Sequence, residues 1–215
     1  MNESDAISLL RKSNSLVFTT RDFSMLADIS GAFASQMLRR LAAKERITRL
    51  YQGLWADAEH PEFNIYQVIP FLTRPHPAAV SMLTALHLHG MIEQIPQVVD
   101  VVTTATTKRV KTPVASYFIH QLKPEFFTGY EFYRGEGKFL IATPEKALVD
   151  SAYFASRKGN RFSALPELHL PKSFSRRRAI QWAKMIPYQK LRASVLDRLG
   201  KWLGKERSPF TFAVK

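Results

Sequence analysis

Residues 16–57 constrain the fold more than any other part of the chain, because helical spacing, a tight break and strand spacing follow one another there. Thr19 and Thr20 form a cap before apolar residues at helical spacing, and Ser30 with Gly31 supplies a tight break. The buried stripe of a second helix then follows at spacings of three and four: Ala34, Leu38, Leu41 and Ala42. This order predicts a helix-turn-helix.

The residues after the second helix extend this pattern to that of a winged helix-turn-helix. Residues 46–51 alternate polar and apolar side chains, and Gln52 with Gly53 forms a turn before the chain returns as a second strand. An amphipathic helix over 3–13 and a short strand over 16–18, which the hairpin could join, precede the motif. We therefore predict a DNA-binding domain over residues 1–58.

The second helix of the motif carries a polar face suited to DNA. This face consists of Ser35, Gln36, Arg39 and Arg40. These side chains are short enough or basic enough to contact base edges or phosphates in a major groove about 12 Å wide. The hairpin adds candidates for phosphate contacts, which set register without reading sequence: Arg49, Tyr51 and Gln52. The alternative is a protein–protein module on the same fold.

The net charge of +13 is concentrated in the last part of the chain. Residues 156–215 hold 15 basic and 3 acidic side chains, whereas residues 1–57 hold 8 and 6. A focused basic surface attracts polyanions and releases their counterions, although a solvated basic face is the alternative. The tail residues that we predict to contact nucleic acid are Arg176, Arg177, Arg178, Lys184, Arg198 and Lys201.

The three consecutive arginines have a further electrostatic property. Arg176, Arg177 and Arg178 fall in the first turns of a predicted helix, where the helix dipole disfavours cations. A nearby anion would relieve this conflict, and a DNA phosphate is the anion that we expect. The tail is therefore predicted to grip phosphates that flank the site read by the second helix of the motif.

The rest of the sequence predicts an overall α+β fold, with a connector at 59–77 and a mixed α/β domain at 78–215 that has a small sheet and a basic helical tail. Prolines interrupt the connector, which holds one predicted short strand at 66–69. The pattern predicts strands at 98–102, 116–122, 130–134 and 138–142 and helices at 78–89, 144–157, 174–186 and 188–203. Thr143 and Pro144 supply the cap and first residue of the helix over 144–157.

Composition excludes several classes of protein. The chain has no cysteine, so it forms neither disulfides nor thiolate zinc sites. No apolar run approaches the ~18 residues that a membrane-spanning helix needs, and the acidic N-terminus does not resemble a secretion signal. We expect a soluble, cytoplasmic protein without a membrane partner.

Four residues suggest a metal-dependent nuclease at first sight: His87, His89, Glu145 and Asp150. The two histidines lie about 200° apart around a predicted helix, and the two carboxylates lie about 140° apart around theirs. Neither pair converges on one ion from its own helix. The chain also lacks a glycine-rich phosphate loop, a Gly-x-Ser-x-Gly elbow and a nucleotidyltransferase motif. We expect no catalytic residue, no metal and no cofactor.

An aromatic cluster allows one more alternative, base stacking in a single-stranded channel. The cluster consists of Phe126, Phe127, Tyr130, Phe132 and Tyr133. Alternation within a sheet explains these residues better, because Glu125, Glu131 and Glu136 in the same segment would repel a nucleic-acid backbone. RNA binding is therefore a minor alternative.

Two segments carry a resemblance to a known family: residues 86–90, Leu-His-Leu-His-Gly, and residues 142–150, Ala-Thr-Pro-Glu-Lys-Ala-Leu-Val-Asp. With the winged helix before them and the basic tail after them, they resemble the AbiEi family, antitoxins of type IV toxin–antitoxin systems, over nearly the whole chain. The resemblance implies a repressor that binds inverted repeats in double-stranded DNA of its own promoter. It also implies a nucleotidyltransferase-like toxin encoded in the same operon.

In that family the winged helix serves promoter binding, and a positively charged face of the C-terminal domain serves repression and antitoxicity. The resemblance carries roles only to Ser35, Gln36, Arg39 and Arg40, and it gives no role to the tail arginines. A second class of function remains open, in which the basic tail holds an acidic partner, such as the toxin itself, and the winged helix is a scaffold.

Overall fold

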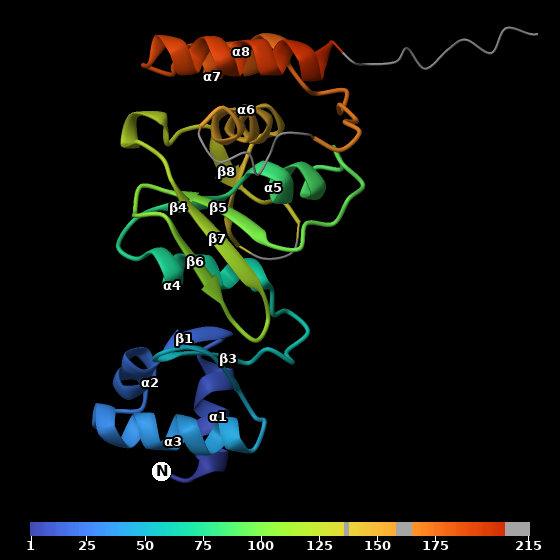
Figure 1. Cartoon of the computed structure of the whole chain (residues 1–215). Helices are drawn as coiled ribbons and strands as arrows, with labels where there is room; N and C mark the ends of the chain where they lie inside the picture. Colours follow the sequence, from blue (N-terminus) through green and yellow to red (C-terminus); the bar gives the residue numbers. More distant parts are fainter. Residues whose placement is uncertain (136–137, 158–164, 205–215) are drawn as a thin grey trace, which may run out of the picture.

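The computed structural model describes residues 1–135, 138–157 and 165–204. Over this part of the chain the protein is a mixed α+β fold with eight α-helices and two β-sheets. Figure 1 shows the helices and the small sheet of residues 1–56 at one end, the larger sheet in the middle, and the last two helices at the opposite end.

The N-terminal elements follow the order predicted from the sequence. They are α1 (Glu3–Lys12), β1 (Val17–Thr19), α2 (Thr20–Leu26), α3 (Gly31–Ala43), β2 (Thr48–Tyr51) and β3 (Leu54–Ala56). Thr19 and Asp22 cap α2 reciprocally, and the Ser30 side chain accepts the Phe33 N–H at the start of α3. The strands form an antiparallel sheet in the order β1-β3-β2, so β1 joins the hairpin as predicted.

This small sheet is buried on both faces. Phe18 and Trp55 pack with α1, α2 and α3 in one core. Val17 and Leu54, on the opposite face of the same strands, belong to the core of the larger sheet. The N-terminal elements and the rest of the chain are therefore joined through a shared apolar interior.

The larger sheet has six strands in the order β6-β7-β5-β4-β9-β8. These are β4 (Ala78–Val80), β5 (Val99–Thr103), β6 (Lys108–Lys111), β7 (Ser116–Gln121), β8 (Tyr130–Phe132) and β9 (Leu140–Ala142). The pairs β5/β7 and β4/β9 are parallel and the others are antiparallel. β8 and β9 are consecutive in the chain and pair antiparallel, and residues 136 and 137 between them lie outside the described residues.

Helices and short turns cover both faces of this sheet. The remaining elements are η1 (Ile65–Val68), α4 (Ile69–Thr73), α5 (Met82–Leu88), η2 (Pro124–Phe126), α6 (Pro144–Ala155), α7 (Arg176–Lys184) and α8 (Gln189–Leu203). On one face the Tyr117 hydroxyl donates to the Ile65 carbonyl of η1 at 2.8 Å. On the other face His120 packs against Phe154 of α6. α7 and α8 then pack on the outer side of α6 (Figure 1).

Two predictions made from the sequence need correction, and one strand was missed. The prediction of a strand at 66–69 is wrong, because Asn64 and Gln67 cap each other and start a helical segment there. Residues 78–80 form a strand, not the start of a helix, since they pair with β5 and β9. The edge strand β6 was not predicted, because only Val110 in it is buried.

The buried tyrosines give the fold a pH dependence. Burial, reinforced by neighbouring Tyr66, raises the pKa of Tyr117 above the value of about 10 expected in the unfolded chain. Its contribution to stability is therefore present below pH 10 and is lost as the pH rises above 10, by up to about 1.4 kcal/mol per pH unit. At pH 8, Tyr117→Phe should cost about 1 kcal/mol, because the Ile65 carbonyl loses a donor.

Urea unfolding of both proteins between pH 8 and 11 measures this effect. The stability difference between wild type and Tyr117→Phe should narrow above pH 10. If the free energies of unfolding of the two proteins change in parallel with pH, the predicted contribution of Tyr117 is contradicted.

Candidate nucleic-acid interface

The outer face of α3 has the composition of a nucleic-acid interface. Gln36, Arg39 and Arg40 are exposed, Ser35 is half-buried, and the opposite side of the helix is buried in the core of the N-terminal elements. At 100° per residue, exposed Ala32 and Ala43 lie near the middle of this face, with the arginines on either side of them. The small residues let the helix approach a surface closely.

Charge on this face is of one sign and is not neutralised internally. The segment Gly31–Ala43 contains no acidic residue. Within the described residues, neither Arg39 nor Arg40 has an ion-pair or hydrogen-bond partner. Two uncompensated guanidinium groups on one helix face attract an anionic partner.

The hairpin residues are also at the surface. Arg49, Tyr51 and Gln52 are exposed, and the Arg49 guanidinium lies over the Trp55 ring, 5.8 Å from its centroid. The Gly53 carbonyl accepts the Thr20 N–H at 2.9 Å, so the turn is held against the start of α2. Gly53 has a φ of 69°, which suits glycine in a tight hairpin turn.

The basic tail residues differ in how they are used within the chain. Arg198 donates to the Ala155 carbonyl at the end of α6, and Lys201 pairs with Asp197 at 2.7 Å. Arg178 lies 3.6 Å from the buried carboxylate of Glu145. Arg177 and Lys184 are exposed. Arg176 also interacts with another group of the protein, so at least four of the six predicted tail contacts already have partners inside the chain.

Glu145 also supplies an anion at the start of α7. Its carboxylate accepts the backbone N–H of Ser175, the residue that caps α7, at 2.9 Å. This charge lies where the helix dipole is positive and where three arginines begin the helix. The predicted conflict between dipole and cations is thus relieved by a residue of α6, without a phosphate.

The two basic regions do not form one surface. α3 lies at one end of the molecule and α7 with α8 at the other, separated by both sheets, α5 and α6 (Figure 1). A straight duplex that contacts α3 would therefore not reach the arginines of α7 in the same chain.

The residues that suggested a metal site are held apart. The His89 ring nitrogen Nε2 lies 2.7 Å from the Ala142 carbonyl, and the buried Nδ1 of His87 has no hydrogen-bond partner among the residues that the structure describes. Glu145 faces α7, whereas Asp150 faces Lys146. Among residues 1–135, 138–157 and 165–204, no group of three or more histidine or acidic side chains is placed to hold an ion.

Asp150 instead organises a buried polar network. The Lys146 amino group donates to one carboxylate oxygen of Asp150, and the hydroxyls of Ser81 and Tyr130 donate to the other at 2.7 and 3.2 Å. Burial lowers the pKa of Lys146, an effect that the Asp150 charge opposes. Burial and the same charge raise the pKa of Tyr130. The motif at residues 142–150 is therefore built into the interior and anchors α6.

Most side chains of the aromatic cluster pack against this interior. Phe126 is buried and packs on Tyr153, and Lys146 lies over the Phe126 ring at 3.9 Å. Phe132 is exposed. These contacts agree with the structural explanation of the cluster and leave few faces on which bases could stack.

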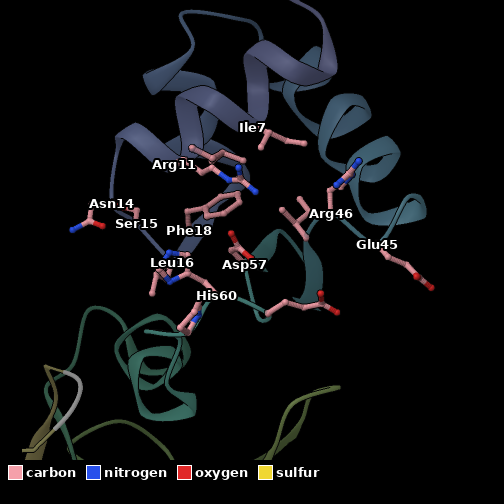
Figure 2. A pocket seen from close by; sticks show the side chains of 14 residues that line it. Ile7, Arg11, Asn14, Ser15, Leu16, Phe18, Glu45, Arg46, Asp57 and His60 are labelled. Atoms are coloured by element: carbon pink, nitrogen blue, oxygen red, sulfur yellow. The ribbon is translucent and has the colours of Figure 1, made fainter.

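A pocket of about 480 Å³ lies between α1 and the segment that follows β3 (Figure 2). Its floor is apolar and includes Phe18. Charged side chains of both signs also line it: Arg11, Arg46, Glu45, Asp57 and Glu59. This mixed rim favours neither an anionic nor a cationic ligand, and no residue of α3 lines the pocket.

Sequence reasoning missed one feature of the α3 face. Phe33, in the first turn of the helix, is 39 % exposed and belongs to this face together with Ala32. The signal was present, because Phe33 is out of phase with the buried stripe of Ala34, Leu38 and Leu41.

No helix in the described part of the chain is long and apolar enough to cross a membrane. No family model matches this chain, and a search of curated proteins finds no similar sequence.

Proposed function

We propose that this chain is a DNA-binding transcriptional repressor whose N-terminal elements act as a winged helix-turn-helix. The observation that carries the proposal is the outer face of α3, where Gln36, Arg39 and Arg40 surround small residues and no acidic side chain is present. A helix of this kind fits a major groove about 12 Å wide, and these side chain types are the ones that read base edges there.

In this proposal α3 enters the major groove, and the hairpin braces the backbone through Arg49, Tyr51 and Gln52. The bound protein blocks RNA polymerase sterically at the promoter of its own operon. The resemblance of residues 86–90 and 142–150 to AbiEi antitoxins supports autoregulation through inverted repeats, in the cytoplasm, as part of a type IV toxin–antitoxin system.

The tail has a separate role in this proposal. Because α7 and α8 lie far from α3 (Figure 1), their exposed cations suit a second partner better than the duplex read by α3. Arg177 and Lys184 would face an acidic protein, and the toxin of the same operon is the partner that the AbiEi resemblance suggests. Binding to DNA and neutralisation of the toxin would then use opposite ends of the chain.

A gel-shift titration tests the main proposal. The purified full chain is mixed with the DNA upstream of its own gene at several salt concentrations, with shuffled DNA of the same composition as competitor. We expect a complex that shuffled DNA does not displace, with an affinity that falls as salt rises, because phosphate contacts release counterions. Absence of a complex in dilute buffer, or equal competition by shuffled DNA, would rule out a sequence-reading repressor.

A further inference from the structure

Phe33 is a large apolar side chain on the polar face of α3. The Ser30 hydroxyl accepts its backbone N–H at 3.3 Å, which fixes Phe33 in the first turn of the helix. In the described part of the chain Phe33 belongs to neither hydrophobic core cluster, and 39 % of the residue's surface is accessible. Leaving an aromatic ring in water is unfavourable, so its position on this face points to a partner with an apolar group.

The neighbours of Phe33 show what kind of partner this is. At 100° per residue, Phe33, Gln36 and Arg40 form one row along the exposed side of α3, with Arg40 only about 20° around the helix from Phe33. The row thus presents a ring, an amide and a guanidinium in sequence. A DNA groove accepts all three groups, and Arg40 has no ion-pair partner within the described residues.

The major groove offers one apolar group, the C5 methyl of thymine. Phenylalanine contacts this methyl, glutamine pairs with the N6 and N7 edge of adenine, and arginine pairs with guanine. Residues in the first turns of a recognition helix are the ones that reach base edges. On the basis of the function proposed above, we infer that Phe33 reads thymine methyl groups, so that the bound DNA has thymine in each half-site beside the base read by Gln36.

Uracil tests this inference, since it keeps the hydrogen-bonding groups of thymine and lacks the methyl. The upstream fragment is amplified with either dTTP or dUTP, and the affinity of the full chain for both products is measured by gel shift. Loss of one buried methyl group should weaken binding about fourfold, and contacts in two half-sites should weaken it about tenfold or more.

The variant Phe33→Ala, measured on both fragments, completes a double-mutant cycle that isolates the contact between Phe33 and the thymine methyl group. It should bind the thymine fragment as weakly as the wild type binds the uracil fragment, and it should bind both fragments alike. Met25→Ala is the matched control, because Met25 is an exposed apolar residue of α2, with 72 % of its surface accessible. This variant should keep the full preference for thymine.

The outcomes separate this inference from the proposed function. Binding that is specific but equal for thymine and uracil overturns the role of Phe33 and leaves the repressor intact. A preference for thymine that persists in Phe33→Ala also overturns it, because the methyl groups would then act through DNA shape. Phe33→Ala could instead lower the oligomeric mass measured by light scattering and weaken binding to both fragments equally. That result would mean that Phe33 joins copies of the chain and does not contact the DNA. Failure to bind either fragment removes the proposed function itself.

Discussion

Arg39→Ala and Arg40→Ala should each weaken binding to the upstream DNA by about 5- to 150-fold, which corresponds to the 1–3 kcal/mol typical of an arginine that pairs with guanine. The variant that loses a base contact should also discriminate less between that DNA and shuffled DNA. Neither change should lower the melting temperature, since neither guanidinium has a hydrogen-bond or ion-pair partner in the described chain.

Arg177→Ala is the matched control for this prediction. It removes the same charge from an exposed position on a helix, but at the opposite end of the molecule (Figure 1). Its affinity for the upstream DNA should stay within about twofold of the wild type, because surface charges this far away are screened at physiological salt. An equal loss of affinity in Arg177→Ala and Arg40→Ala would mean that DNA binding depends on the net charge of the protein and not on the α3 face.

Asp150→Ala should lower the free energy of unfolding by about 3–5 kcal/mol, the cost of leaving one member of a buried ion pair without the other. Both Lys146 and Asp150 are fully buried, and the same substitution removes the acceptor of the Ser81 hydroxyl. Urea denaturation of both proteins at pH 7 measures the difference.

The double variant Lys146→Met, Asp150→Leu controls for this interpretation. It replaces both charges by apolar side chains of similar size, so no buried charge is left unpaired, and it should be less destabilised than Asp150→Ala. If the double variant is less stable than Asp150→Ala, the ion pair contributes more to the free energy of unfolding than an unpaired buried lysine removes from it.

Local signals in the sequence were sufficient for most elements. The cap at Thr143 with Pro144, the break at Ser30 with Gly31 and the turn at Gln52 depend on residues within a few positions, and the structure has helix or hairpin boundaries there. The short strand at 78–80 was missed because its state is decided by β5 and β9, whose residues lie far away in the sequence.

The candidate site shows the same limit. The α3 face followed from helical periodicity, and even Phe33 could have been found by projecting the helix. The partners of Glu145 could not be predicted from the sequence, because Ser175 lies 30 residues away and its contact depends on how α7 packs on α6. The tail arginines therefore looked alike in the sequence, although Arg178 pairs with Glu145 and Arg177 has no ion-pair partner within the described residues.

The two-sided burial of the small sheet makes the N-terminal elements unsuitable for transplantation. A fragment cut after residue 58 would uncover Val17, Leu50, Leu54 and Ala56, all of which are shielded in the intact chain. Such a strip of aliphatic side chains invites self-association and precipitation. A chimeric protein that uses these N-terminal elements should therefore keep the larger sheet, which covers these four side chains.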